Sequence, residues 1–323
     1  MVMHTPPMLL SGIVHSKVPM GPYSTMGIGG PARYLCAVDS QEDLSILLHW
    51  AHERALPWIV AGECSNILFS DKGVDGLVIL NRLSGVARKD GSQVLVGSGE
   101  NLGKLILWLN QNGLQGMEKM YGIPGTIAGA VVGNAGAYGQ EICQTLKEAT
   151  LIKVSGDLEV VPAEAMGFKY RHSRLKKDRG SVLVECRLEL SPDVEHLQKE
   201  SDAILKKRSI KYPPGLKCPG SFFKNIEVSS LDSDQRSRIP ASFFYNGKVP
   251  AGKLLDTVGA KGARKGEAMI ASYHANLILN CGRCSSADVL WLARTYANRV
   301  LDRYGIILEP EIRILNEGLE EEK

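Results

Sequence analysis

The sequence predicts a two-domain protein that combines helices with strands. Its 323 residues correspond to about two domains of ordinary size. Hydrophobic residues make up 44% of the chain and charged residues 23%, which is typical of globular proteins with a sizeable core and not of disordered chains. Short apolar runs of strand length alternate with segments of helical spacing. These observations favour a fold of mixed α and β structure.

The first half of the chain alternates helices and buried strands. Leu44, Leu47 and Leu48 recur with helical spacing and predict a helix over 43–55. Short strands are expected at 58–61, 77–80 and 94–96, and an amphipathic helix over 105–112 that Gly113 ends.

The second half begins with strands expected at 150–154 and 182–190. A charged helix over 192–211 then leads into Pro213-Pro214-Gly215, and this helix and turn together are the best domain boundary in the chain. A helix over 286–304 and a strand over 306–315 follow. Residues 1–20 are expected to form a loose leader, and the charged residues 317–323 a frayed tail.

Composition excludes several classes of protein. Lys and Arg number 38 and Asp and Glu 35, a weaker basic bias than nucleic-acid-binding proteins carry. No apolar run approaches the ~18 residues of a membrane span, and the start lacks the pattern of a signal peptide. Seven scattered cysteines indicate a reducing compartment, which predicts a cytoplasmic protein. The pair Cys281 and Cys284 is a weak zinc motif and is expected to be half-buried, so no metal is predicted.

A glycine-rich segment is the strongest local anomaly. Six glycines lie between Gly122 and Gly139, and each would cost about 1 kcal/mol inside a helix relative to alanine. The backbone there either approaches a bulky anion or packs as a tight turn against a helix. The turn 61–66, directly after a strand, is a second candidate for holding a diphosphate. Glycines at 97, 99 and 103 do not have the spacing of a dinucleotide fingerprint.

Three further stretches carry reactive or charged side chains. Residues 170–179 concentrate positive charge and form either a solvated face or an anion site. Ser221 lies in a glycine turn beside two aromatic residues and Lys224, where a serine is a turn residue or a proton donor. Alternation places Glu309, Glu311 and Arg313 on one face of the terminal strand, which Pro310 assigns to a sheet edge.

In this order, the pieces resemble one family, the UDP-N-acetylenolpyruvoylglucosamine reductases. The resemblance covers about residues 20–316 and lies in seven segments: 24–32, 62–66, 122–139, 170–173, 220–225, 261–280 and 308–314. It implies an α+β fold with a two-subdomain FAD-binding module of the PCMH or vanillyl-alcohol-oxidase type. That module would span 21–195, divided at about residue 75, and a C-terminal α/β substrate-binding domain would span 210–316.

The resemblance also implies a reaction in peptidoglycan precursor synthesis. NADPH would reduce non-covalently bound FAD, and the hydride would pass to the enolpyruvyl group of a UDP-linked amino sugar to give UDP-N-acetylmuramate. The matching catalytic residues are Arg171, which would stabilise charge on the substrate carboxylate, Ser221, the proton donor, and Glu311, which works with them. Glu309 matches less well.

Binding residues are implied in the same way. Lys224, Asn225, Lys261 and His274 match substrate contacts. The residues that would hold FAD are Ile28, Gly29, Gly30, Gly62, Glu63, Cys64, Ser65, Asn66, Gly122, Ile123, Pro124, Gly125, Thr126, Gly129, Asn134, Ala135 and Gly136.

Departures from the family pattern predict local differences. Ser24, Met26 and Gly27 replace the usual asparagine, phenylalanine and arginine, and Cys64 and Ala128 replace glycines near the expected cofactor. A Cβ atom at these two positions requires φ < 0 or a displaced loop. The short spacing from Arg171 to Ser221 leaves no room for a tyrosine-bearing loop of some members, so the chain resembles the class without it.

Two alternatives remain open on the sequence. A non-catalytic relative that binds a flavin or a nucleotide sugar would be expected to have lost Arg171, Ser221 or Glu311, and all three are present. An oxidase of the same flavin fold would tether FAD covalently to a histidine or cysteine, for which Cys64 is the candidate. The favoured hypothesis, the reductase, predicts NADPH and a UDP-sugar as binding partners, with no nucleic acid and no membrane insertion.

Overall fold

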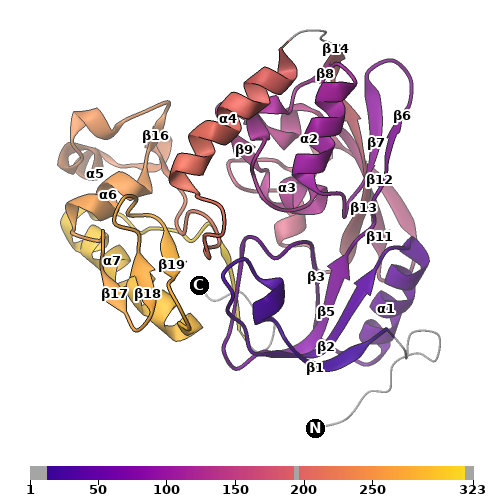
Figure 1. Ribbon diagram of the computed structural model, residues 1–323, viewed down its shortest axis with the longest axis horizontal. Coiled ribbons are helices and arrows are strands. Elements are labelled where there is room, and N and C mark those ends of the chain that lie inside the picture. Colours follow the sequence, from indigo (N-terminus) through magenta and orange to yellow (C-terminus); the bar gives the residue numbers. More distant parts are fainter. Residues whose placement is uncertain (1–12, 193–195, 317–323) are drawn as a thin grey trace. The chain divides into compact units, whose positions relative to one another are not determined.

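The computed structural model describes residues 13–192 and 196–316. The chain divides into two compact units, whose elements are labelled in Figure 1. Of the described residues, the first unit contains 13–18, 32–64 and 75–210, and the second contains 19–31, 65–74 and 211–316. Each unit has hydrophobic core clusters of its own.

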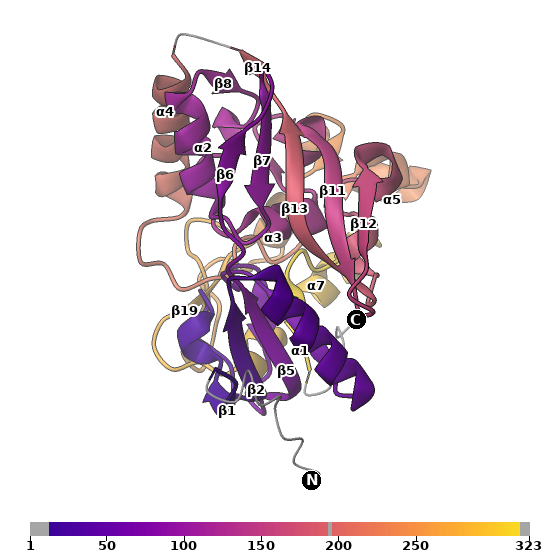
Figure 2. The same ribbon diagram turned by 90° about the vertical axis from the view of Figure 1, so that its right-hand side faces the viewer.

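The first unit begins with a four-stranded sheet of order β1-β2-β5-β3. Its strands are β1 (His15–Pro19), β2 (Pro31–Val38), β5 (Val74–Asn81) and β3 (Trp58–Ala61), and β3 runs parallel to β5. Helix α1 (Gln41–Glu53) begins at Ser40, whose hydroxyl accepts a hydrogen bond from the N–H of Asp43. The leucines of α1 share a core cluster with β5, and Figure 2 shows the helix beside this sheet.

A five-stranded antiparallel sheet forms the rest of the first unit, in the order β12-β11-β13-β7-β6. The strands are β12 (Leu158–Pro162), β11 (Leu146–Lys153), β13 (Ser181–Glu189), β7 (Gln93–Gly97) and β6 (Val86–Arg88). They lie side by side in Figure 2. Helices α2 (Leu102–Gln111) and α3 (Ile127–Gly133) share one core cluster with this sheet, so the glycine-rich segment is packed beside regular structure.

Shorter elements complete the first unit. β8 (Leu114–Gln115) pairs with β14 (Ser191–Pro192), and β9 (Gly136–Ala137) with β10 (Gln140–Glu141). Single 3-10 turns are Glu118–Met120, Ile142–Gln144, Ala163–Met166 and Arg174–Lys176. Helix α4 (Leu197–Lys211) is fastened to α2 because buried Ser201 accepts a hydrogen bond from the Asn110 amide at 2.9 Å.

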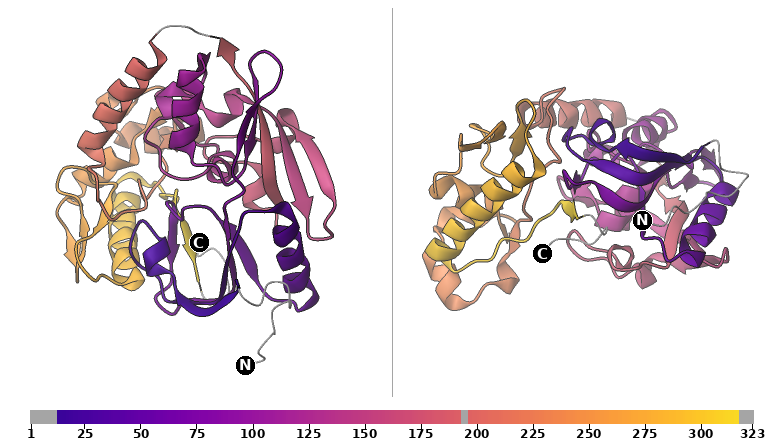
Figure 3. Two further views of the ribbon diagram at one scale, coloured as in Figure 1. Left: turned by 45° about the vertical axis from the view of Figure 1, so that its right-hand side comes forward. Right: turned by 90° about the horizontal axis from the view of Figure 1, so that it is seen from below.

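The second unit is built around the long helix α7 (Ser286–Tyr304), which Figure 3 shows in yellow. It packs with the three-stranded sheet β17 (Arg264–Lys265), β18 (Ala268–Ile270) and β19 (Ile278–Asn280). β15 (Ile226–Glu227) pairs with β16 (Lys248–Val249), and β4 (Ile67–Phe69) runs parallel to β20 (Arg313–Leu315). Helices α5 (Ser233–Arg238) and α6 (Ala251–Thr257) and the 3-10 turns Gly21–Tyr23, Val228–Ser230 and Ala241–Phe243 complete it.

The predicted domain boundaries differ from these units at two early segments. Residues 19–31 and 65–74 belong to the second unit, although both were expected in a continuous first domain over 21–195. Backbone pairing is the reason: the N–H of Gly30 donates to the carbonyl of Ser70, whose own N–H donates to the carbonyl of Leu315. The helix expected between the domains lies largely in the first unit.

Two other expectations need correction. Residues 1–20 are not a loose leader throughout, because His15–Pro19 is a strand; residues 1–12 lie outside the described range, as does the expected tail 317–323. The terminal strand covers only Arg313–Leu315 instead of 306–315. Its expected first half forms one isolated bridge, Pro310 opposite Phe223, and therefore joins a different neighbour from β20.

Hydropathy and helix length bear on membrane association. Within residues 13–192 and 196–316, none of the helices combines the length and the apolar character that a membrane crossing needs.

Candidate active site

Ser221 lies in a turn of the second unit whose hydroxyl has two side-chain partners. Lys211 Nζ donates to Ser221 Oγ over 3.3 Å, and Tyr212 Oη is 3.2 Å from the same atom. The preceding Gly220 has φ +90°, a left-handed conformation that favours glycine. Lys211 is the last residue of α4, so the end of this helix places the ammonium group beside the serine.

Glu311 is held next to this turn by main-chain bonding. The N–H of Glu311 donates to the carbonyl of Phe222 at 2.8 Å, and the N–H of Lys224 donates to the carbonyl of Glu309 at 2.9 Å. Two of the predicted catalytic residues, Ser221 and Glu311, are thereby brought together on adjacent segments of the second unit. The side chain of Glu309 is 72% exposed and forms an ion pair with Lys224.

The expected substrate residues of the second unit already have protein partners. Lys224 forms the ion pair with Glu309 at 2.9 Å, and Lys261 one with Asp256 at 2.6 Å. Asn225 Oδ1 accepts the N–H of Ala251, which begins α6. To bind an anionic ligand, these lysines would have to give up their carboxylate partners. Asn225 instead stabilises the start of α6.

His274 is neutral at physiological pH. Burial is the main cause that lowers its pKa to about 4, and the positive charges of Lys211 and Lys261 add to the effect. Its Nδ1 accepts the N–H of Asn276 at 3.2 Å. A neutral imidazole offers hydrogen bonds and no charge to a ligand.

Arg171 belongs to the first unit, where it is tied to the glycine-rich segment. Its guanidinium donates to the carbonyl oxygens of Asn134 at 3.3 Å and Gly136 at 3.0 Å, and lies over the ring of Tyr170. Its backbone has φ +53°, and Lys176 Nζ donates to its carbonyl oxygen at 2.7 Å. The guanidinium is therefore held in place by main-chain carbonyl groups of the glycine-rich segment.

The glycine-rich segment forms a short helix between two turns. Thr126 caps the start of α3 by accepting the N–H of Gly129. Asn134 ends it in the left-handed conformation, and its amide donates to the carbonyl of Lys169 at 3.0 Å. Gly122 and Gly125 have φ +83° and +117°, so their lack of a side chain is a backbone requirement.

Glu63 takes one of the backbone donors expected to serve a diphosphate. Its carboxylate accepts the N–H of Gly125 at 3.1 Å and the Asn101 amide at 2.6 Å. It thus fastens the loop after β3 to the glycine-rich segment. A Cβ atom on neighbouring Gly62 would overlap Thr126, so this glycine serves the same close packing.

Cys64 corrects one expectation about this loop. Its φ is +49°, so of the two expected arrangements, φ < 0 or a displaced loop, the first is wrong for this cysteine; Ala128, within α3, is not among the residues with positive φ. The Cys64 side chain is buried, and burial raises the pKa of its thiol to about 12. A thiol held protonated in this way is a poor nucleophile for tethering a cofactor.

Five of the residues expected to hold FAD lie in the second unit: Ile28, Gly29, Gly30, Ser65 and Asn66. Ile28 is part of its core, and a Cβ atom on Gly30 would overlap the Asp71 carbonyl. Asn66 donates from its amide to the carbonyl of Glu311 at 3.2 Å. Ile28, Gly30 and Asn66 thus have packing or bonding roles that need no ligand. The other expected residues, including Ile123, Pro124 and Ala135, lie in the first unit.

α3 presents bare backbone that fits a flat, polyanionic cofactor. A Cβ atom on Gly133 would meet nothing within 4 Å outside its own helix, and one on Gly129 only the Thr126 hydroxyl at 3.8 Å. These two glycines are one helical turn apart and leave space that a side chain could have filled. With the loop 122–125 and the Arg171 cation nearby in the same unit, the residues present fit FAD.

The two cysteines of the pair, Cys281 and Cys284, differ in exposure. Cys281 is exposed, whereas Cys284 is buried and its pKa is raised to about 12 by burial and by the carboxylates of Asp288 and Asp71. Among the residues that the structure describes, no cluster of three His, Cys, Asp or Glu side chains is arranged to hold a metal ion.

Sequence reasoning did not identify Lys211 and Tyr212 as partners of Ser221. The only local signal is a basic and an aromatic residue at a helix end before Pro213 and Pro214. Such an ending is also typical of an ordinary solvated helix terminus. Asn276, whose side chain bonds to Phe223, likewise lies in no motif that the sequence singled out.

Two family models match the chain. The model of the C-terminal domain of UDP-N-acetylenolpyruvoylglucosamine reductase matches residues 212–315, and the model of an FAD binding domain matches residues 32–161. The expected architecture, an FAD-binding module followed by a C-terminal domain of this reductase type, is confirmed.

Relatives match over nearly the whole chain. The UDP-N-acetylenolpyruvoylglucosamine reductase of Solibacter usitatus is 33% identical over 311 residues, covering 95% of this chain and 99% of that protein. That of a Synechococcus strain is 35% identical, covering 95% and 92%. The crystal structure of the enzyme from Thermus caldophilus is 31% identical with a TM-score of 0.72, covering 93% of this chain and 98% of the other. The chain therefore belongs to the UDP-N-acetylenolpyruvoylglucosamine reductase family.

Proposed function

We propose that this protein is an FAD-dependent UDP-N-acetylmuramate dehydrogenase that acts in peptidoglycan precursor synthesis. Its substrate is UDP-N-acetyl-3-O-(1-carboxyvinyl)-glucosamine, its product UDP-N-acetylmuramate and its reductant NADPH. The observation that carries the proposal is the Ser221 hydroxyl, held by Lys211 and Tyr212 and placed beside the segment of Glu311. This arrangement occurs in a chain of the reductase family, where a proton donor is required.

FAD, when bound, supplies the hydride that reduces the enolpyruvyl double bond. The residues proposed to hold it are the Gly122–Gly136 segment, the loop from Gly62 to Asn66 and Ile28 to Gly30. Within that set, the glycines of α3 leave backbone uncovered by side chains. Glu63 holds the loop after β3 against the glycine-rich segment by accepting the N–H of Gly125.

Ser221 holds the proton that the substrate carbon receives. The Lys211 ammonium donates to Ser221 Oγ, which favours the negative charge that this oxygen acquires as it gives up its proton. Glu311 orients this group and the substrate from the neighbouring segment. Arg171, fixed by two carbonyl groups, stabilises the negative charge that grows on the substrate carboxylate.

The remaining substrate contacts are assigned to four residues. Lys224 and Lys261 exchange their carboxylate partners for anionic groups of the UDP-sugar. His274, a neutral ring whose Nδ1 already accepts the N–H of Asn276, donates a hydrogen bond from Nε2, and Asn225 shapes the site through α6. Small ligands are the partners we propose, since a net charge of +3 gives nucleic acid little to bind. The seven free thiols support a cytoplasmic location.

Substitution of the proton donor tests this proposal. In Ser221→Ala, we expect kcat to fall by ~10²–10⁴-fold, because a positioned general acid contributes about that factor. Bleaching of the bound flavin by NADPH without oxygen should be unchanged, because that half-reaction does not use the serine. The measurement is anaerobic absorption spectroscopy followed by turnover of the UDP-sugar.

Ser230→Ala is the matched control. This serine is exposed in the same unit and donates to the carbonyl of Glu227, so its loss should leave kcat unchanged. Full activity in Ser221→Ala would refute the role of the serine. A protein that never binds FAD would refute the enzyme itself.

A further inference from the structure

Asn276 is a buried polar residue of the second unit whose side chain is wholly engaged with the segment after Ser221. It is 3% exposed. Its Oδ1 accepts the N–H of Phe223 at 2.9 Å, and its Nδ2 donates to the carbonyl of Phe223 at 2.8 Å. Its own carbonyl accepts the N–H of Phe222, also at 2.9 Å. One residue thus makes three hydrogen bonds to the main chain of two consecutive residues.

The other side of this segment is bonded to the chain around Glu311. The carbonyl of Phe222 accepts the N–H of Glu311, and the N–H of Lys224 donates to the carbonyl of Glu309. The N–H and C=O groups of Phe222 and Phe223 are therefore all paired: three with Asn276 and one with Glu311. Asn276 therefore provides the hydrogen-bond partners for those main-chain groups of Phe222 and Phe223 that the 309–311 segment does not reach.

The geometry requires an amide of this length. Asparagine combines an acceptor and a donor in one small planar group, whereas glutamine adds a methylene, and a histidine a larger ring, that a buried site has no room for. An aspartate would set a carboxylate oxygen against the Phe223 carbonyl, and a leucine would leave two buried main-chain groups unpaired.

Asn276 also joins Ser221 to His274. Both His274 and Asn276 lie in a turn closed by the N–H of Ala271 on the carbonyl of Leu277 at 2.9 Å. The N–H of Asn276 donates to His274 Nδ1 within that turn. A single rigid connection therefore links a proposed substrate contact to the proposed proton donor.

We propose that Asn276 is a positioning residue for Ser221: its amide fixes the peptide units that follow the serine, and so fixes where the serine hydroxyl delivers its proton. The inference rests on the proposed function and concerns a residue that needs no contact with the substrate. It predicts that loss of the amide affects proton delivery and leaves ligand binding intact.

The test uses the FAD-loaded, full-length protein with Asn276→Ala and Asn276→Ser, the latter leaving room and a hydroxyl for water to satisfy Phe223. We expect kcat to fall on the order of 10²-fold, as displacement of a reacting group by about 1 Å can produce. KM for the UDP-sugar and the rate of flavin bleaching by NADPH should stay at wild-type values. The solvent deuterium isotope effect on kcat should increase, since proton delivery becomes slower than the other steps.

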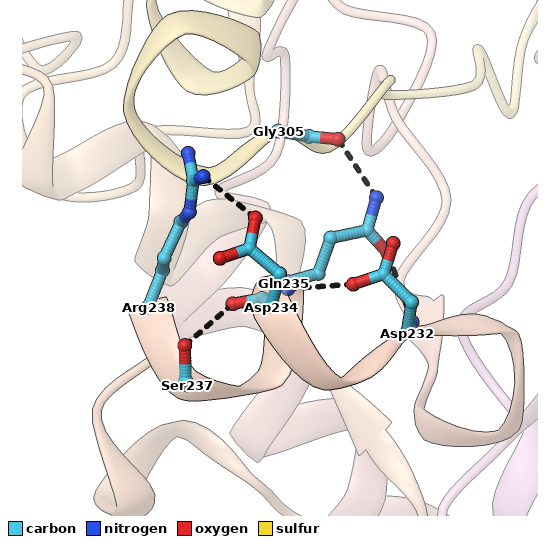
Figure 4. A network of polar contacts seen from close by, with 6 residues as sticks. All are labelled: Asp232, Asp234, Gln235, Ser237, Arg238 and Gly305. Atoms are coloured by element: carbon cyan, nitrogen blue, oxygen red, sulfur yellow. Dashed lines mark hydrogen bonds and ion pairs between the residues drawn. The ribbon is translucent and has the colours of Figure 1, made fainter.

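Gln235→Ala is the matched control. This half-buried amide in the same unit also bridges main-chain groups, donating to the carbonyl of Gly305 at 2.8 Å and accepting the N–H of Asp232 at 3.2 Å (Figure 4). None of the residues in that network belongs to the proposed site. We expect Gln235→Ala to lower the melting temperature but not kcat or the isotope effect.

Each outcome has one meaning. A folded Asn276 variant with wild-type kcat and isotope effect overturns the inference. The same follows if Gln235→Ala reproduces the loss, or if neither Asn276 variant folds, because the role would then be structural. If the wild-type protein neither bleaches with NADPH nor turns over the UDP-sugar, it is the proposed function that fails.

Discussion

At the scale of single residues, His274 shows how burial sets the charge of a polar group. The ring lies near two lysine side chains and is partly buried, and both effects disfavour its protonated form. Cys64 is a second case, in which burial keeps a thiol protonated where a reactive thiolate would be needed for a flavin tether. In both cases the residue type allows a charged and a neutral form, and burial of the side chain favours the neutral form.

The pH dependence of the free energy of unfolding tests the lowered pKa of His274. The pKa of the folded state, about 4, lies below the ordinary 6.5, so between these values the unfolded chain binds a proton that the native state does not. The stability that this histidine contributes is therefore lost as pH falls from about 6.5 to about 4. We expect the free energy of unfolding to drop less in His274→Gln than in the wild type, by at most about 2 kcal/mol at pH 4.5, because water screens a partly exposed ring.

Urea unfolding at pH 4.5 and pH 7.5 measures this difference. Ser230→Ala, which removes an exposed hydroxyl and no titratable group, provides the control and should follow the wild-type pH dependence. An identical pH dependence in His274→Gln and wild type would mean that the ring is solvated in the native state.

At the scale of elements, α3 and the turn before β2 use glycine for opposite reasons. Gly30 has no side chain because the Asp71 carbonyl occupies the place of its Cβ atom. Gly129 has open space around it, so its lack of a side chain has no packing cause within the chain. The first glycine serves the fold, and the second leaves backbone bare for a ligand.

Alanine at these two glycines should therefore separate folding from FAD binding. We expect Gly30→Ala to lower the free energy of unfolding by about 1–3 kcal/mol or more, because main-chain atoms would have to move. Gly129→Ala should preserve stability or raise it by up to about 1 kcal/mol, since alanine is the better helix former, and should weaken FAD binding. Urea unfolding of the FAD-free proteins and titration of flavin fluorescence measure the two effects. Wild-type FAD affinity in Gly129→Ala would remove α3 from the cofactor site.

At the scale of the whole molecule, the proposed cofactor residues come from both compact units. Each unit has hydrophobic core of its own. Along the chain, residues 19–31 and 65–74 belong to the second unit, although the residues before and after each of them belong to the first. A ligand that binds the folded state and not the unfolded chain stabilises the folded state by mass action.

FAD should accordingly stabilise the wild-type protein by about 2.7 kcal/mol at a free concentration of 100 times Kd. The measurement is the melting temperature with and without FAD, which should be higher with FAD. Denaturation of the loaded protein should release all FAD into the filtrate, because Cys64 is a buried, protonated thiol. Flavin that stays with the denatured chain would contradict this and identify a covalent oxidase.

Local patterns were sufficient for elements whose ends are written into neighbouring residues. The helix over 286–304 was predicted residue for residue, because Ser285 and Asp288 form a capping box and Gly305 ends the helix in a left-handed conformation. The ordered motifs likewise determined the family and, through it, the module that binds FAD. These signals act over a few residues and need no tertiary contact to be read.

Tertiary structure decided what depends on partners distant along the chain. Alternation predicted a strand over 306–315, but residues 309–311 pair with 222–224, and only Arg313–Leu315 joins β4. The bonds from Lys211 and Tyr212 to Ser221, and from Asn276 to Phe223, cross turns whose path the local pattern does not define. The sequence by itself determined the family, the chemistry available and the bounds of the helix over 286–304, whereas the helices expected over 43–55 and 105–112 cover Gln41–Glu53 and Leu102–Gln111. Only folding decided which donor meets which acceptor, because hydrogen-bond partners are selected by geometry and burial and not by spacing.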